Sequence, residues 1–250
     1  MTINESVQIT KEKFEESFSE GGYYNKQTAD REHLALLLNL VNAQSDDTIL
    51  DLGTGSGYVA FALSEKCKKC NVIGLDIVTD TLSRNREITK KAGISNLEFL
   101  DYDGTVFPFP DSSMDCIVTR YAMHHFPDIE NSFKEMYRVL KSEGKLVIAD
   151  PVPNENDNDR FVDKYMQIKQ DGHIKFYSLS EYKKMLEPIG FSLLSSEMTT
   201  ICFPRKKIDS CMKLLSETEN HIIEDYKIRI TDEEIWITEQ VENMVFRKEG

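Results

Sequence analysis

A glycine-rich turn near the start of the chain constrains its fold more than any other feature of the sequence. Three alternating glycines, Gly53, Gly55 and Gly57, follow an apolar run at 48–52 and precede a helical pattern that begins at Tyr58. Glycine has no Cβ, so the backbone can turn sharply there and a ligand can approach its amides. The helix that follows would point its free N–H groups and its positive dipole end at the turn. Strand, turn and helix together predict a cradle for a nucleoside-type cofactor at the edge of a parallel sheet.

The spacing of the glycines separates classes of cofactor. The dinucleotide fingerprint G-x-G-x-x-G needs its third glycine where this chain has Tyr58, and here an acid, Asp51, precedes the first glycine. The pattern D-x-G-x-G-x-G resembles motif I of the S-adenosylmethionine (SAM) dependent methyltransferases with a Rossmann-like fold. The resemblance implies that Asp51 and the turn residues Gly53, Thr54 and Gly55 receive the methionine end of SAM. The alternative is a tight strand–helix turn without a ligand.

Two further apolar runs carry acids that fit the same cofactor. Asp76 lies near the end of the run at 72–77, about twenty residues beyond the glycines, where a carboxylate at a strand tip can accept two ribose hydroxyls. Ile77 would pack on the adenine. In the family that the chain resembles, an acid at the position of Asp103 accepts the adenine amino hydrogens, and the amide at Gly104 contacts a ring nitrogen. A solvated acid at a strand end is the alternative reading of Asp76.

A fourth apolar run, at 114–119, leads into a loop that carries Arg120, His124 and His125. This loop would lie at the carboxyl edge of the sheet, where open α/β sheets bind ligands. The resemblance places Arg120 at the methionine end of SAM through its backbone, and its charge could also meet an acidic acceptor. The "PFPD" sequence before this run and the "RVLK-x-x-G" sequence after it are also typical of the family.

The resemblance covers about residues 20–200 and is most specific over 48–150. It is closest to the group that includes the ubiquinone and menaquinone biosynthesis methyltransferases. Strands and helices alternate over 48–150, which implies parallel strands with right-handed crossovers. We therefore expect an α/β fold with a doubly wound, seven-stranded, mostly parallel sheet whose last strand is antiparallel. A single domain over 1–250 would comprise an N-terminal cofactor and acceptor cover at 1–45, a SAM-binding core at 48–150, a lid at 151–180 and a possible cap insertion at 204–230.

The second half of the chain has weaker signals. A helix is expected near 161–170, and another is expected to begin with Ser180 as N-cap and to end at Gly190. A strand follows at 191–202. Helical periodicity extends over 205–223, and the alternation at 235–247 predicts a final strand that pairs antiparallel to the one before it.

Composition limits the partners. The formal net charge is −13 and the isoelectric point is about 4.9, so the phosphates of a nucleic acid would be repelled. No apolar run approaches about eighteen residues, which predicts no membrane span. The N-terminal sequence MTINE has neither the basic nor the apolar region of a secretory signal. We expect a monomer or homodimer that acts on a small-molecule acceptor in the cytoplasm.

The cysteines also favour a cytoplasmic location. Their number is odd and they lack the spacing of a disulfide framework, which suits a reducing cytoplasm. The pair Cys67 and Cys70 is formally C-x-x-C, but no second pair completes a tetrahedral zinc site, so we interpret it as the end of a helix and its turn. The sequence predicts no metal site.

Candidate catalytic residues follow from the chemistry of methyl transfer. Displacement at a sulfonium needs an aligned nucleophile and exclusion of water, and it needs a base only where the acceptor must lose a proton. Histidine is the simplest such base near pH 7. Of the three histidines in suitable regions, His125 matches a loop position that carries an active-site histidine in some relatives, and His173 lies in the expected lid. These two are the candidates, and Tyr23 or Tyr24 could reach the cofactor or the acceptor, with Tyr24 as a candidate cofactor ligand.

The sequence thus predicts transfer of a methyl group from SAM to a small-molecule acceptor at O, N or C, with S-adenosylhomocysteine as the other product. Two alternatives stay open. One is a non-catalytic SAM-binding or regulatory protein that has lost the acceptor site. The other is an NAD-dependent oxidoreductase, which Tyr58 disfavours because it replaces the third glycine of the fingerprint. Fold alone does not identify the acceptor.

Overall fold

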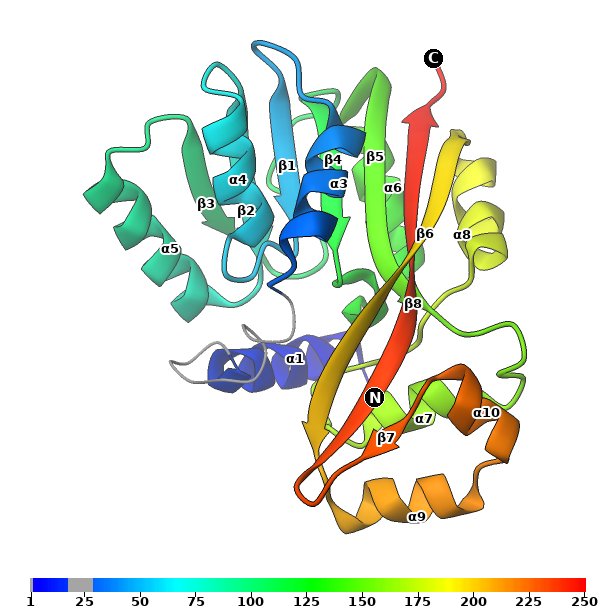
Figure 1. Cartoon of the computed structure of the whole chain (residues 1–250). Helices are drawn as coiled ribbons and strands as arrows, with labels where there is room; N and C mark the ends of the chain where they lie inside the picture. Colours follow the sequence, from blue (N-terminus) through cyan, green and yellow to red (C-terminus); the bar gives the residue numbers. More distant parts are fainter. Residues whose placement is uncertain (1, 18–28) are drawn as a thin grey trace.

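A single mixed sheet forms the centre of the protein, as the computed structural model shows for the described residues 2–17 and 29–250. Its strand order is β3-β2-β1-β4-β5-β8-β6, with a short β7 paired to β8 (Figure 1). β8 runs antiparallel to both β5 and β6, and the strands from β3 to β5 are parallel. The expected sheet with an antiparallel last strand is confirmed, and β7 is an addition. The strands are β1 (Thr48–Leu52), β2 (Asn71–Asp76), β3 (Leu97–Asp101), β4 (Met114–Arg120), β5 (Leu140–Val152), β6 (Phe191–Lys206), β7 (Arg229–Ile230) and β8 (Glu234–Lys248).

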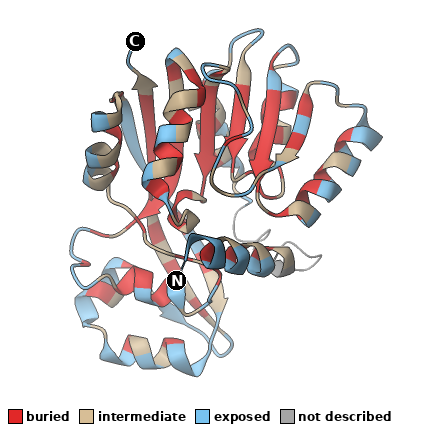
Figure 2. Ribbon diagram, turned by 180° about the vertical axis from the view of Figure 1, so that it is seen from behind, coloured by how far each residue is buried: buried red, intermediate tan, exposed pale blue. Residues whose placement is uncertain are grey.

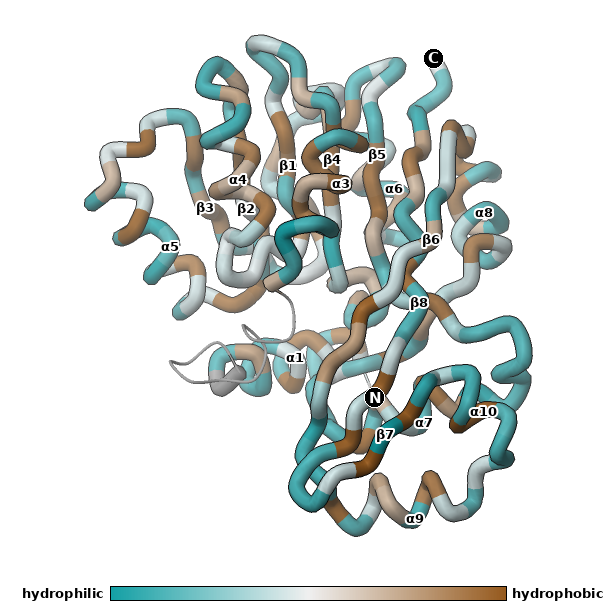
Figure 3. Tube along the Cα trace, in the orientation of Figure 1, coloured by the Kyte–Doolittle hydropathy of each residue, from teal (hydrophilic) through white to brown (hydrophobic). Residues whose placement is uncertain are grey.

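Helices cover both faces of this sheet. Successive residues of a strand point to opposite faces, so Ile49 and Leu50 of β1 enter two different apolar cores. α3, α4 and α5 pack against one face, and α6 and α8 pack against the other. The central strands are accordingly buried in Figure 2 and carry apolar runs in Figure 3. The helices are α1 (Ile3–Ser17), α3 (Arg31–Val41), α4 (Tyr58–Lys66), α5 (Thr79–Ala92), α6 (Ile129–Val139), α7 (Phe161–Gln167), α8 (Leu179–Leu186), α9 (Asp209–Glu217) and α10 (Asn220–Asp225).

β6 and β8 form a long antiparallel pair that extends beyond the carboxyl edge of the sheet, although α9, α10 and β7 lie between them in the sequence. Pairing of β5 with β8 ends at Val152 and Gln240, whereas β6 and β8 stay paired as far as Lys206 and Glu234. We call residues 201–206 and 234–239 the hairpin extension. Together with β7, α7, α9 and α10 it forms a lower lobe, and α1 lies beside this lobe under the sheet (Figure 1).

Two expectations for the segment between β5 and β6 need correction. The helix after the fifth strand spans 161–167 and is shorter than expected. Ser178 and not Ser180 is the N-cap of α8, because Glu181 lies three residues after Ser178 and completes a capping box with it. A short 3₁₀ turn at 187–189 then leads to Gly190, whose positive φ of 111° ends the segment as expected.

The helical periodicity over 205–223 does not produce one helix. β6 continues through Lys206 because its backbone stays paired with β8, and α9 begins only at Asp209. α9 and α10 are then separate short helices. Local periodicity was outweighed here by strand pairing between segments distant in the sequence.

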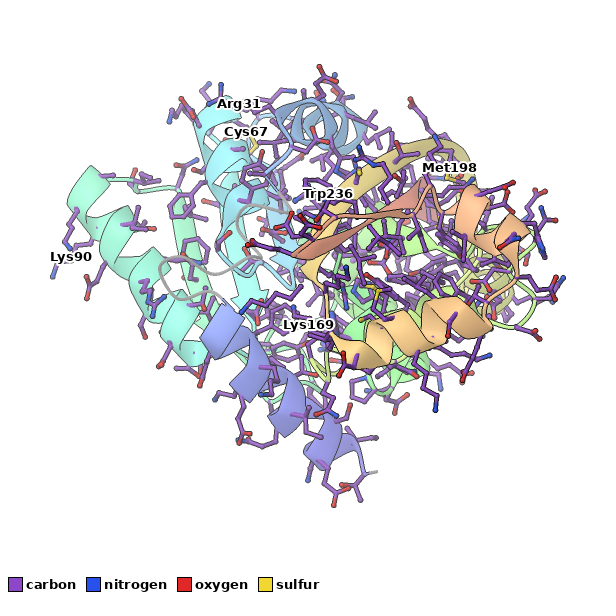
Figure 4. All side chains as sticks on the ribbon, turned by 60° about the horizontal axis from the view of Figure 1, so that its bottom comes forward. Arg31, Cys67, Lys90, Lys169, Met198 and Trp236 are labelled. Carbon is purple, nitrogen blue, oxygen red and sulfur yellow. A yellow bond between two sulfur atoms is a disulfide. The ribbon has the colours of Figure 1, made fainter. Side chains whose placement is uncertain are left out.

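The cysteine pair lies where expected, but its chemistry differs. Cys67 is the C-cap residue of α4 and Cys70 precedes β2, and the two sulfurs form a disulfide that the sequence did not predict (Figure 4). Cys116, Cys202 and Cys211 are free. Within the described ranges, no helix is both long and apolar enough to cross a membrane.

Candidate active site

A cavity lies at the carboxyl ends of β1, β2 and β4, between the sheet and α1. We call it the first cavity. The glycine turn, the segment after β2 and the loop after β4 provide its upper walls, and Val7, Thr10 and Phe14 of α1 line its lower side. The carboxyl ends of parallel strands meet at this edge, which is why Asp76 and the glycines Gly53, Gly55 and Gly104 line one cavity.

Asp76 lies at the inner end of the first cavity and is buried. Its Oδ2 accepts a hydrogen bond from the Gly55 amide at 2.8 Å, and its Oδ1 accepts one from the Val78 amide at 3.0 Å. Burial raises the pKa of this carboxyl, and the backbone N–H groups oppose that rise. An ionised carboxylate offers about four acceptor sites, so both oxygens keep capacity for a ligand. The position fits the predicted ribose ligand, and that role stays a prediction.

The glycine turn is held by Asp51. Its Oδ2 accepts hydrogen bonds from Thr54 Oγ1 at 2.6 Å and from the Ala60 amide at 3.0 Å, which ties the turn to the first turn of α4. Burial raises the pKa of Asp51 to about 7. Gly53 has a φ of 71°, and a Cβ on it would lie 2.5 Å from the Cβ of Ala122, so only glycine fits there.

A side pocket adjoins the first cavity and shares Gly53 and Gly55 with it. Asp51, Thr54, Tyr58 and Arg120 also line this pocket. The arrangement places a carboxylic acid, a hydroxyl and a guanidinium around one small space. Charged and polar ends of a ligand would be recognised here, as predicted for the methionine end of SAM.

Arg120 lines this pocket, and its side chain packs among aromatic rings. Its guanidinium lies 5.2 Å from the ring centre of Tyr58 and 4.2 Å from that of Tyr121. Its Nε donates to Nδ1 of His33 at 3.0 Å, and the other ring nitrogen of His33 hydrogen-bonds Asn243 Oδ1 at 2.7 Å. Burial lowers the pKa of His33, which keeps the ring neutral beside the cation.

The adenine-side predictions fall into two groups. Ile77 and Gly104 line the first cavity, together with Tyr102, which the sequence did not indicate. Asp103 is exposed, and its Oδ1 accepts hydrogen bonds from the amides of Thr105 and Val106, so the carboxylate stabilises its own turn outside the lining. Tyr24, and with it Tyr23 and the whole segment 18–28, lies outside the described residues.

A second cavity adjoins the first through three shared residues, Phe14, Tyr121 and His125. The expected loop after β4 and the expected lid do contribute to it. The hairpin extension of β6 and β8 also contributes, which the sequence did not indicate. The remaining lining residues are His124, Pro151, Met166, Lys169, Asp171, Phe176, Ile201, Phe203, Arg205 and Glu239.

A buried histidine–aspartate pair borders this second cavity. His124 Nδ1 lies 3.0 Å from both carboxylate oxygens of Asp150, at the end of β5. The Tyr182 hydroxyl donates to the same carboxylate at 3.3 Å. Burial raises the pKa of Asp150 to about 7 and lowers the pKa of His124 well below its usual value. In the described part of the chain, no hydrogen bond engages the other ring nitrogen of His124, Nε2.

The two histidines named from the sequence occupy different places. His125 lies where the two cavities meet, and burial, together with neighbouring His124, lowers its pKa to about 3. His173 lies behind His124, with 5.3 Å between ring centres, and its Nε2 hydrogen-bonds Asp163 Oδ1 at 2.9 Å. The structure therefore groups His124, His125 and His173 together, but only the first two line the second cavity.

Several site residues were missed by sequence reasoning. Phe14 and His33 come from helices before the first strand and carry no local motif. Glu239 did leave a signal, because it falls in the apolar phase of a strand whose buried residues Ile235, Ile237 and Val241 alternate with more exposed ones. A charged residue in that phase indicates either a buried partner or a binding surface.

Comparisons with known proteins identify the family of the chain. A family model described as a methyltransferase domain matches residues 43–188. The uncharacterized methyltransferase YcgJ of Bacillus subtilis is 32% identical over 161 residues, covering 64% of this chain and 63% of that protein. A demethylmenaquinone methyltransferase of Thermus thermophilus is 32% identical over 116 residues, covering 46% of this chain and 52% of the relative. The matched region thus spans about half to just under two thirds of these relatives.

Solved structures show the same fold. The crystal structure of YcgJ from B. subtilis aligns with a TM-score of 0.76 at 22% identity, covering 88% of this chain and all of that one (100%). A geranyl diphosphate methyltransferase in complex with GPP and sinefungin aligns with a TM-score of 0.64 at 15% identity, covering 87% of this chain and 77% of the other. Since the family model covers more than half of the sequence, the chain belongs to the methyltransferase domain family.

Proposed function

We propose that the protein transfers a methyl group from SAM to a small-molecule acceptor, at an oxygen, nitrogen or carbon atom. One observation carries the proposal: the first and second cavities meet at Phe14, Tyr121 and His125. A cofactor in the first cavity and an acceptor in the second would therefore face each other across this junction. The relatives named for demethylmenaquinone support a small acceptor.

The residues around the first cavity and the side pocket fit SAM. Asp76 would accept the ribose hydroxyls, and Ile77 and Tyr102 would enclose the adenine. The Gly104 amide would contact a ring nitrogen, and a side chain at this position would press on Val7 of α1, since a Cβ there would lie 3.0 Å from it. The side pocket around Arg120 would take the carboxylate and amino ends. SAM would supply an electrophilic methyl group on sulfur.

The protein's own contribution is to orient the acceptor and exclude water. α1 covers the first cavity from below (Figure 1), and Phe14 of α1 lines both cavities where they meet. We propose that the 151–180 segment and the 204–230 segment enclose the acceptor as lid and cap. Removing water strengthens the electrostatic effect of the remaining polar groups.

For an acceptor that must lose a proton, the geometry favours His124. Asp150 would hold the Nδ1–H of His124 by a charge-assisted hydrogen bond, which leaves Nε2 as the base. His125 would position the acceptor at the junction. His173 would orient the cluster through its bond to Asp163, since it lies behind His124.

Calorimetry and product analysis test the proposal. The purified chain should release heat with SAM and with S-adenosylhomocysteine, but not with NAD. Incubation with SAM and pools of small acceptors should then release S-adenosylhomocysteine with at least one pool. Heat with NAD alone would contradict the cofactor assignment, and binding of SAM without turnover across broad pools would favour a non-catalytic SAM-binding protein.

A further inference from the structure

The hairpin extension gives one end of the second cavity an unusual chemistry. Ile201 pairs with Glu239 across the hairpin, and Arg205 pairs with Ile235 four residues farther along β6. Residues two apart on a strand share a face, so Ile201, Phe203 and Arg205 point to the same side as Glu239. All four line the second cavity. One face of the hairpin extension thus presents an apolar surface that carries one carboxyl group, of Glu239, and one guanidinium, of Arg205.

One carboxyl oxygen of Glu239 is buried without a hydrogen-bond partner among the described residues. The residue is 1% exposed, and its Oε1 makes no hydrogen bond to any described residue. Burying a polar group without a hydrogen bond is unfavourable, and such groups in folded proteins ordinarily have a partner. Burial also raises the pKa of Glu239 to about 8, so the group carries its proton at neutral pH and can donate a hydrogen bond. A ligand atom in the cavity would provide the missing partner.

Arg205 is held in place without a carboxylate partner. Its guanidinium lies 5.5 Å from the ring centre of Tyr165 and 5.8 Å from that of Phe203, and it donates to the Met166 sulfur at 2.9 Å. No described carboxylate lies within ion-pair distance of it. In contrast, Lys169 is paired with Asp171 at 3.0 Å. Lys169 also lines the second cavity, and in Figure 4 it lies between α1 and α9.

We propose that Arg205 and Glu239 select an acceptor whose apolar, ring-sized body carries a carboxylate or another anionic oxygen. The inference rests on the proposed function, because it identifies the second cavity as the acceptor site. The guanidinium would donate to the anionic oxygen, and the protonated Glu239 would donate a further hydrogen bond to the same group. Phe14, Met166, Phe176, Ile201 and Phe203 would pack against the apolar body.

The test uses 2-naphthoate and its neutral isostere 2-naphthamide as probes. Both are titrated by calorimetry into the full-length chain, with and without saturating S-adenosylhomocysteine. Naphthoate should bind at least roughly tenfold more tightly than naphthamide, since one charge-assisted hydrogen bond distinguishes them. Arg205→Met should abolish this preference while leaving naphthamide affinity within about twofold, and Arg205→Lys should retain part of it.

Lys206→Met is the matched control, because the neighbouring residue on β6 is exposed on the opposite face and should leave both affinities unchanged. Naphthamide binding and a melting curve report whether the Arg205 variants are folded, and Arg205→Gln replaces Arg205→Met if the latter is not. Equal affinities of the two probes, no binding of either, or an unchanged preference in the Arg205 variants would overturn the inference. Absence of S-adenosylhomocysteine binding is a separate result and would count against the proposed function.

Glu239→Gln gives a second readout that a purely structural role would not change. Above about pH 8, ionised Glu239 would repel the anionic probe, so wild-type affinity for naphthoate should fall there. Asp150 has a pKa of about 7, so its ionisation should lower the affinity for naphthoate near pH 7 in both the wild type and Glu239→Gln. The fall above pH 8 should be absent in Glu239→Gln, and its persistence would exclude Glu239 from the contact. The ionisable groups whose charges act on Glu239 or respond to it are Arg205, Asp150, Asp163, Tyr121, Tyr165 and Tyr226.

Discussion

Replacement of Glu239 by glutamine should make the free energy of unfolding less dependent on pH. In the folded chain burial raises the pKa of Glu239 from 4.5 to about 8. Between these values the unfolded chain has lost the proton that the folded chain still holds, so a rise in pH favours unfolding. The stabilising contribution of this group is therefore complete below about pH 4.5 and is lost as pH rises toward 8.

The magnitude follows from the two pKa values. A tenfold difference in proton affinity is worth about 1.4 kcal/mol. The rise in the pKa of Glu239 from 4.5 to about 8 therefore corresponds to about 5 kcal/mol in the free energy of unfolding. Between pH 5 and pH 8 the wild-type chain should lose about 3–4 kcal/mol relative to Glu239→Gln. Asp51 and Asp150 also have raised pKa values, but their contributions are common to both proteins and cancel in the comparison.

Urea unfolding followed by circular dichroism at pH 5 and pH 8 measures this difference. The glutamine side chain keeps the size of the original and cannot ionise, so packing changes little. Glu233→Gln, at an exposed position six residues earlier, is the control and should follow the wild-type curve at both pH values. If the difference between wild type and Glu239→Gln were the same at pH 5 and pH 8, the buried, protonated state of Glu239 would be refuted.

Three further predictions concern the cofactor and the base. Asp76→Ala should weaken SAM binding by about 1.5–3 kcal/mol for each lost charge-assisted hydrogen bond, and it should also lower the melting temperature, because the Gly55 and Val78 amides lose their acceptor. An unchanged dissociation constant would remove Asp76 from the site. Gly53→Ala should also weaken SAM binding in calorimetry, because the new Cβ would lie 2.5 Å from Ala122, and normal affinity would show that the turn can move. For an acceptor that must lose a proton, kcat/KM should rise as pH passes through about 7, where Asp150 ionises and frees Nε2 of His124; the same profile in Asp150→Asn would contradict the role of this pair.

The cofactor side of the site could be predicted from the sequence because it is local. Asp51 and the glycines lie within one strand–turn–helix unit, and Asp76 ends the next strand, so parallel strand order alone brings them together. Each residue type in this unit also has a clear physical reason. Gly53, for example, leaves space for Ala122, which a Cβ at position 53 would touch. Asp103 shows the limit, because a motif position does not reveal that its carboxylate hydrogen-bonds its own turn.

The acceptor side could not be predicted in the same way. Phe14, His124 and Arg205 reach one cavity from an N-terminal helix, a loop and a hairpin that are far apart in the chain. Their meeting depends on how far β6 and β8 remain paired beyond β5, which is a property of tertiary contacts. The same dependence explains why the periodicity near 205 indicated a helix where the structure has a strand.

The two parts of β8 should also differ in how well they tolerate substitution. Next to β5, residues 241–246 of β8 are buried on both faces of the sheet, so almost any change there would disturb the core. Over 234–239 buried residues of β8 alternate with more exposed ones, and one of the buried residues, Glu239, lines the second cavity. If the second cavity is the acceptor site, as proposed, substitutions at its lining residues in the hairpin extension would alter which molecules are methylated while leaving the cofactor site unchanged. A laboratory search for new acceptors should begin with libraries at Phe203, Arg205 and Glu239, which line the second cavity.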